Sequence, residues 1–258
     1  MFINFFIFFI FLTFSIILIC KKNNLIVDFK LEKHKRYSSK SKSYSIGGFL
    51  LVSYLFYYFF YLKNDLLTFV YFFLIFLIGF LSDIKKLNSV SLRFFLQIVL
   101  ILFFSQVLNL QIISTKIDLI DNLLSNTFIN SIFVTFCLMV LINGGNFIDG
   151  LNTLLIKYFI LIYLILFISL SSFIPESDNF IKNLILVLVV LLCLNSFGII
   201  YMGDSGAYLI SLLTGFFLIN FSSSNPEISP YLVIVLLWFP CFELLFSMVR
   251  RKFNEKKN

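Results

Sequence analysis

The chain has 258 residues, of which 60% are hydrophobic and 13% are charged, and its formal net charge is +7. Soluble domains carry about 25% charged residues, so the composition excludes an ordinary soluble domain and predicts an integral membrane protein. The alternation of polar and apolar residues that β-barrel strands require does not recur along the chain, so the predicted class is all-α. The positive charge indicates membrane orientation, and no nucleic-acid partner is expected.

Nine apolar segments are candidates for membrane-spanning helices, which need about 20 residues each. They cover residues 2–20, 46–62, 66–82, 92–108, 128–142, 151–172, 183–200, 207–221 and 230–249. The first could be a signal peptide, but it lacks a basic stretch before its apolar run and a small-residue cleavage site after it. We therefore expect a retained helix, in one membrane domain that spans residues 1–258.

The Lys and Arg residues predict the orientation of this bundle. Nine helices with the N-terminus outside leave five inner segments, at residues 21–45, 83–91, 143–150, 201–206 and 250–258. Of the 20 Lys and Arg residues, only Lys63, Lys116 and Lys182 then lie outside. This asymmetry follows the positive-inside rule and places the C-terminus in the cytoplasm. The outer segment 109–127 is long enough for a hairpin or an interfacial helix, and both remain open.

Three carboxylates lie at inner ends of the predicted helices: Asp83, Asp149 and Asp204. Carboxylates that converge on one membrane face suit a divalent cation, because Mg²⁺ takes oxygen ligands together with waters and substrate phosphates. The alternative is that each Asp caps a helix, which contributes about 1 kcal/mol. Together, in segments that also contain glycine, the three favour a metal-dependent site.

The basic inner segments have two interpretations. The segment 21–45 is dense in Lys and Arg, contains the only histidine, His34, and leads into Gly47 and Gly48. Attraction to anionic lipid accounts for its charge, and a cationic rim for phosphate-bearing substrates is the functional alternative. Arg93 begins a predicted helix, where its guanidinium either extends to the membrane interface or grips a phosphate.

Four motifs in chain order carry a resemblance to a known family. They are H-(x)n-GG, G-x-x-x-D-(x)n-R-x-x-x-Q, N-x-x-N-F-I-D-G-L-N and M-G-D-S-G, which begin at His34, Gly79, Asn143 and Met202. With them, residues 21 to 252 resemble the polyprenyl-phosphate N-acetylhexosamine-1-phosphate transferases of glycosyltransferase family 4. That superfamily includes the phospho-MurNAc-pentapeptide and undecaprenyl-phosphate GlcNAc-1-phosphate transferases. The resemblance implies a helical bundle whose cytoplasmic loops form the active site.

The resemblance also implies a reaction. A polyprenyl phosphate such as undecaprenyl phosphate attacks the β-phosphorus of a UDP-N-acetylhexosamine such as UDP-GlcNAc, and UMP is released. Mg²⁺ is the implied cofactor, with Mn²⁺ as an alternative. Carried over by position, Asp204 and Asn146 are metal ligands, Asp149 lies in the nucleotide and metal site, and Asp83 lies near the lipid phosphate.

The remaining implied site residues bind substrate. Arg93 holds phosphate, and Asn152 contacts the uracil or ribose. The other members of this group are Gly150, His34, Gly47 and Gly48. The implied location is a bacterial cytoplasmic membrane, with a multi-pass chain and the active site facing the cytoplasm. The implied product starts a cell-wall or lipopolysaccharide O-antigen glycan, and a homodimer remains open.

Two departures from the family pattern bear on activity. Ser82 precedes Asp83 where members of the family usually carry two adjacent aspartates. The sequence also ends at Asn258, before the expected His-bearing loop and last helices, so we expect a C-terminally incomplete or pared-down chain. Two alternatives therefore stand beside the transferase. One is an inactive family member, and the other is a membrane transporter without chemistry, although charged residues near mid-membrane are few.

Overall fold

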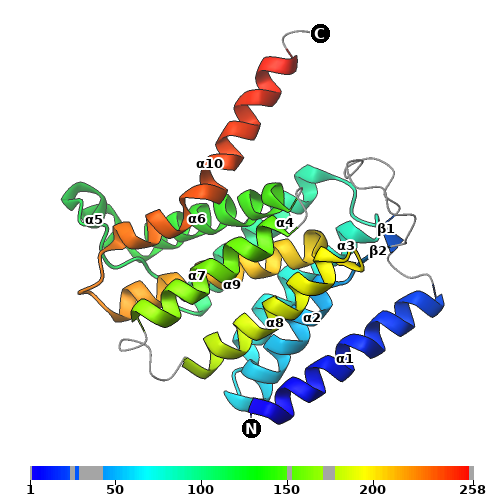
Figure 1. Ribbon diagram of the computed structural model, residues 1–258. Helices are drawn as coiled ribbons and strands as arrows, with labels where there is room; N and C mark the ends of the chain where they lie inside the picture. The colour runs from blue at the N-terminus through cyan, green and yellow to red at the C-terminus, as the bar shows by residue number, and fades with distance from the viewer. Residues whose placement is uncertain (1, 24–26, 29–42, 150–152, 171–177, 256–258) are drawn as a thin grey trace. The chain divides into compact units, whose positions relative to one another are not determined.

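The computed structural model describes residues 2–23, 27–28, 43–149, 153–170 and 178–255. Within these residues the chain forms ten α-helices, one π-helix and three short strands (Figure 1). It divides into two compact units. Unit 1 comprises Met1–Lys86 and Asp149–Ala207, and unit 2 comprises Leu87–Ile148 and Tyr208–Asn258.

The helices confirm the helical class that the composition predicts. Unit 1 contains α1 (Phe2–Asn23), α2 (Gly47–Leu55), the π-helix η1 (Phe56–Leu62), α3 (Leu66–Asp83), α7 (Leu154–Leu170), α8 (Asp178–Ser196) and the start of α9 (Gly203–Ser224). Unit 2 contains α4 (Val90–Val107), α5 (Asp118–Leu124), α6 (Thr127–Ile148), the rest of α9 and α10 (Pro230–Glu255).

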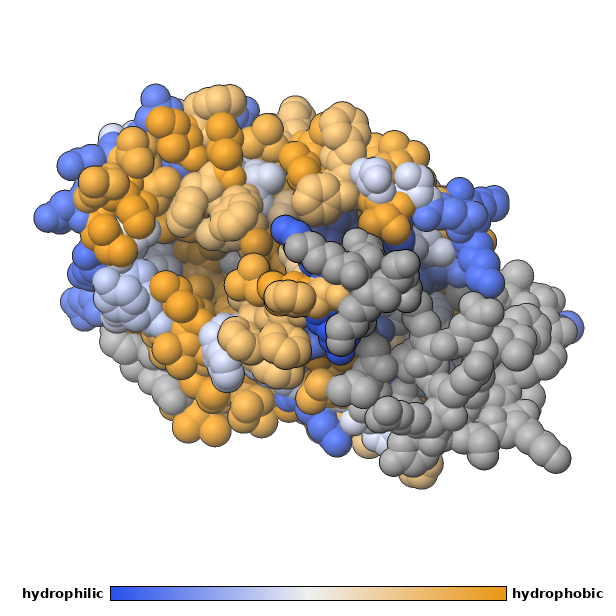
Figure 2. Space-filling model, turned by 90° about the horizontal axis from the view of Figure 1, so that it is seen from above, coloured by the Kyte–Doolittle hydropathy of each residue, from blue (hydrophilic) through white to orange (hydrophobic). Residues whose placement is uncertain are grey.

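Six of these helices are long and apolar enough to cross a membrane, namely α3, α4, α6, α8, α9 and α10. Three shorter apolar helices, Phe9–Cys20, Gly47–Phe60 and Leu154–Ile168, occupy the other three predicted positions. Large apolar side chains such as Phe94, Phe128 and Trp238 are exposed. Figure 2 shows hydrophobic residues over much of the face in view. Soluble proteins rarely expose so much apolar surface, so the chain is a multi-pass membrane protein.

The NGGNFI stretch corrects one predicted boundary. The sequence places a loop at residues 143–150, but α6 continues through Ile148, so Asn143 and Asn146 are helical. The amide nitrogen of Asn143 donates to the carbonyl oxygen of Met139 at 2.8 Å, one helical turn earlier. Gly144 leaves no space for a Cβ beside the backbone of Pro240 in α10. The glycine therefore serves close helix packing within unit 2 and not a turn.

The segment 109–127 contains the short helix α5, so of the two alternatives the helix agrees with the structure better than the hairpin. Ahead of α5, the carboxylate of Asp121 accepts hydrogen bonds from the backbone N–H and the hydroxyl of Thr115, both at 2.6 Å. These bonds hold the pKa of the Asp121 carboxyl below its ordinary value. The turn that enters α5 is thus closed by one charged side chain.

A small sheet in unit 1 was not predicted. Its strands are β1 (Val27–Asp28), β2 (Ser43–Ser45) and β3 (Ile200–Tyr201), in the order β1-β2-β3. β1 is antiparallel to β2, whereas β2 is parallel to β3, with Tyr44 opposite Ile200. Strands of two or three residues carry no readable alternation, so the sequence shows no sign of them. Because β2 leads into α2 and β3 leads into α9, the parallel pair brings the starts of these two helices together.

Candidate functional site

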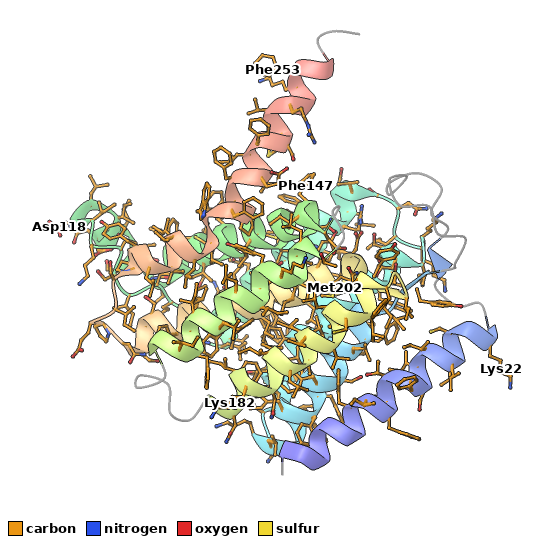
Figure 3. The ribbon with its side chains drawn as sticks, in the orientation of Figure 1. Lys22, Asp118, Phe147, Lys182, Met202 and Phe253 are labelled. Carbon is orange, nitrogen blue, oxygen red and sulfur yellow. The ribbon has the colours of Figure 1, made fainter. Side chains whose placement is uncertain are left out.

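The candidate site lies in unit 1, at the N-terminus of α9. Met202, labelled in Figure 3, is buried and precedes Gly203, whose φ of +69° lies in the left-handed region. A Cβ on Gly203 would also come within 2.8 to 3.0 Å of the carboxylate atoms of Asp83. Glycine is therefore required here both for backbone conformation and for space.

Asp83 caps α9 from another helix. The carbonyl oxygen of Met202 accepts from the N–H of Gly206 at 3.2 Å, so Met202 stands at the N-cap position. Methionine offers no side-chain oxygen that could cap the helix. Asp83, the last residue of α3, supplies the oxygens instead. Its Oδ1 accepts from the N–H of Asp204 at 2.8 Å, and its Oδ2 accepts from the N–H of Ser205 at 3.1 Å.

The side chain of Ser205 completes this cap. Its hydroxyl donates to Oδ2 of Asp83 at 2.6 Å, and Ser205 is fully buried. The negative charge of Asp83 also lies at the positive end of the helix dipole, where it is stabilising. Asp83 therefore does cap a helix, which was the alternative to a metal site. The helix that it caps is α9, which begins 120 residues later in the chain.

Ser82 orients the carboxylate of Asp204. The Ser82 hydroxyl donates to Oδ2 of Asp204 at 2.6 Å, and both side chains are half-buried. A hydrogen bond to a charged acceptor is stronger than one between neutral groups. The residue that departs from the family pattern is therefore in direct contact with the principal predicted metal ligand. An aspartate at position 82 would present a second negative charge at this place.

Glycines allow three helices to meet at this point. A Cβ on Gly79 of α3 would overlap the backbone of Ser205. A Cβ on Gly48 would approach the Ser205 hydroxyl oxygen to 2.6 Å, and one on Gly47 would approach Cα of Met202 to 2.8 Å. Gly47 and Gly48, predicted as substrate-binding residues, therefore pack α2 against the start of α9.

Part of the predicted site converges within unit 1. Asp83, Asp204, Gly47 and Gly48 converge in unit 1, and Asp149 also belongs to unit 1, half-buried just after the end of α6. Arg93, in the first turn of α4, and Asn146, near the end of α6, belong to unit 2. His34, Gly150 and Asn152 lie outside the described residues.

Two residues in contact with this region were missed. Ser205 was visible within the MGDSG motif, but nothing indicated that its side chain would complete the cap. Asn195, near the end of α8, is buried and bonds to both Thr153 and Ile200. A single amide inside an apolar run gives no signal of such a role in the sequence.

The donor chemistry of the site fits Mg²⁺. Among the residues that the structure describes, no group of three or more His, Cys, Asp or Glu side chains could hold a metal. Mg²⁺ does not need such a cage, since it is usually bound by one or two carboxylates together with waters and substrate phosphates. The half-buried, hydrogen-bonded carboxylate of Asp204 suits that kind of ligand.

Comparison with known families matches residues 66–222, more than half of the chain, to glycosyl transferase family 4. The matched region begins with α3 and ends within α9, so it includes Ser82, Asp83, Asp149 and Asp204. Comparison with curated proteins and with solved structures finds no match.

Proposed function

The chain belongs to glycosyl transferase family 4, and from this premise we propose that it transfers N-acetylhexosamine 1-phosphate from a UDP-sugar to a polyprenyl phosphate. Family membership implies sugar-1-phosphate transfer to polyprenyl phosphate. The sugar is proposed to be an N-acetylhexosamine carried by UDP, the acceptor undecaprenyl phosphate, and the destination a glycan of the cell envelope. In the proposed reaction an oxygen of the lipid phosphate bonds to the β-phosphorus. The bond from that phosphorus to the bridging oxygen breaks, and UMP leaves with the oxygen.

The observation that carries the proposal is the fixed carboxylate of Asp204. Ser82 donates to it, and Asp83 holds the helix turn on which it stands. Because Asp83 occupies the N–H groups of Asp204 and Ser205, these groups are not offered to a substrate phosphate. A cation that Asp204 would hold would then neutralise the phosphate charge, together with the side chains proposed to bind phosphate. When bound, Mg²⁺ would supply this neutralisation, which phosphoryl transfer chiefly needs.

Ser82 is compatible with turnover. A phosphate monoester has a second pKa of about 6, so the lipid phosphate is largely ionised near neutral pH without a protein base. A hydroxyl at position 82 can therefore replace a carboxylate and still orient Asp204. An active enzyme is therefore favoured over an inactive member of the family.

The other predicted residues complete the proposal. Asn146 is a second metal ligand, and Asp149, Gly150 and Asn152 belong to the nucleotide site. Arg93 and His34 are proposed to bind substrate phosphate, while Asp83 acts through α9 as a positioning residue. The proposed orientation places this site at the cytoplasmic face of a bacterial membrane, because the Lys and Arg residues gather on that side.

The first test removes the proposed metal ligand. In a membrane preparation with undecaprenyl phosphate, UDP-GlcNAc and Mg²⁺, the wild-type chain should release UMP. Asp204→Asn should lower that release by at least about 10²-fold, since the amide removes the charge that the cation requires. Asp118→Asn in α5, an exposed carboxylate outside the site, is the matched control and should keep wild-type turnover. Equal turnover by wild type and Asp204→Asn would refute the metal assignment.

A further inference from the structure

Asn195 joins two segments of unit 1 with one side chain. It lies in the last turn of α8 and is only 4% exposed. Its Oδ1 accepts from the backbone N–H of Thr153 at 2.9 Å, and its Nδ2 donates to the carbonyl oxygen of Ile200 at 3.0 Å. A buried amide needs partners at both ends, and here the two partners are 47 residues apart in the chain, from Thr153 to Ile200.

The first partner holds an unusual backbone conformation. Thr153 has a φ of +68°, in a region that β-branched residues rarely adopt. Its carbonyl oxygen accepts from the N–H of Lys157 at 2.9 Å, so Thr153 is the residue that immediately precedes α7. Strained backbone of this kind persists only where the surroundings hold it in place. The hydrogen bond from Thr153 to Asn195 is such a constraint, and Thr153 comes four residues after Asp149.

The second partner leads into the cap of α9. Ile200 begins β3, pairs with Tyr44 of β2, and lies four residues before Asp204. A displacement of Ile200 would therefore be passed through Tyr201 and Met202 to the turn that carries Asp204.

We propose that Asn195 is a positioning residue, which fixes Thr153, the residue just before α7, against the strand that leads to Asp204. This inference rests on the proposed function, in which one segment serves the nucleotide and the other serves the metal. Its amide sets the distance between the two segments without touching substrate. The competing explanation is a buried amide that contributes stability alone.

The chemistry of the amide allows the two bonds to be separated. Asn195→Leu removes the donor and the acceptor with little change of shape. Asn195→Asp keeps an acceptor for Thr153 but turns a carboxylate towards the carbonyl oxygen of Ile200. Asn183→Leu is the matched control, because Asn183 lies in the same helix and its Oδ1 has no hydrogen-bond partner among the described residues.

Two measurements on the full-length protein in membranes distinguish positioning from stability. The first is hydrogen–deuterium exchange of peptides that cover Thr153 and β3. The second is UMP release per folded molecule, with kcat and the KM for UDP-GlcNAc determined separately. A purely structural role lowers the amount of folded protein but leaves the KM of the remaining folded molecules unchanged.

Asn195→Leu should expose the Thr153 amide to exchange and raise the KM, and it should lower kcat/KM by about 10²-fold, the cost of a displacement of about 1 Å. Asn195→Asp should keep the Thr153 amide protected, loosen β3 and lower kcat/KM by less. Asn183→Leu should match wild type in both measurements. If Asn195→Leu fails to fold, Asn195→Asp alone tests the proposal. It should leave exchange in the Thr153 peptide unchanged and increase exchange in the β3 peptide.

Unchanged exchange at Thr153 and β3, or unchanged KM and kcat in both Asn195 variants, would overturn the proposal. Failure of the proposed function has a different signature. A wild-type chain that releases no UMP would refute the transferase, while exchange in the variants would still decide whether Asn195 holds the two segments together.

Discussion

At the scale of single residues, the hydroxyl of Ser82 shows how a local departure from a family pattern is accommodated. Compared with the family pattern, the chain has Ser82 where an aspartate is usual, so one carboxylate is missing. In the structure Ser82 donates to Oδ2 of Asp204, so the neighbouring carboxylate gains a donor and avoids a like charge. Hydrogen bonds to charged groups contribute about 1.5–3 kcal/mol. The orientation of Asp204 should therefore depend on this hydroxyl.

Removing the Ser82 hydroxyl should weaken cation binding. For Ser82→Ala we expect the Mg²⁺ concentration at half-maximal UMP release to rise about tenfold, because Asp204 loses the donor that orients it. Ser196→Ala is the matched control, since the exposed Ser196 hydroxyl bonds only to Leu192 of its own helix among the contacts shown. Direct Mn²⁺ binding to the protein without substrates gives a second readout. Identical cation dependence in Ser82→Ala and wild type would rule out this role.

At the scale of secondary-structure elements, the site depends on how closely α3 and α2 approach the start of α9. Glycine at positions 79 and 48 leaves room for the backbone and side chain of Ser205. The parallel pairing of β2 with β3 aligns the starts of α2 and α9. The Asp83 cap, the glycine contacts and the strand pairing therefore all position the first turn of α9, which carries Asp204.

A side chain at position 79 should separate α3 from α9. Gly79→Ala gains about 0.5–1 kcal/mol of helix propensity, but its Cβ would overlap backbone atoms of Ser205, which cannot rotate away. Overpacking costs about 1–3 kcal/mol, so we expect a lower midpoint of thermal unfolding in detergent and a loss of UMP release.

The control for this prediction is Gly198→Ala. Gly198 has a φ of +66°, and a Cβ there would meet no atom within 4 Å. It should cost only the strain of a left-handed alanine, about 1 kcal/mol, and should leave UMP release largely intact. A Gly79→Ala protein as stable and as active as wild type would show that α3 and α9 do not pack this closely.

At the scale of the whole molecule, the membrane determines the arrangement of the chain. Backbone groups in lipid must be hydrogen-bonded internally, so the apolar runs become helices. Figure 3 places Lys182, predicted to lie outside, and Met202, beside the candidate site, at opposite ends of α8. The orientation proposed from the basic residues therefore separates the candidate site from the outer Lys182.

The orientation can be tested with a reporter fused after Asn258. We expect cytoplasmic fluorescence from a fluorescent-protein fusion and no activity from an alkaline phosphatase fusion, because Lys and Arg retain their segments inside. A phosphatase inserted at Lys116, in the predicted outer segment before α5, should be active. The opposite pattern at both positions would invert the topology and move the candidate site to the outer face.

The sequence by itself determined the helical class, the position of each apolar helix and the residues of the MGDSG motif, because hydrophobic runs and short motifs are local properties. It ended this helix too early, at Ile142, whereas α6 continues through Ile148, since helix packing at Gly144 overrides the apparent turn signal of NGG. Only the tertiary structure decided that Asp83 caps α9, that Ser82 contacts Asp204 and that Asn195 joins Thr153 to β3. The contacts of Asp83 and Ser82 link residues 121 or 122 positions apart. Such pairings depend on which helix ends meet, and no local pattern in the chain records that.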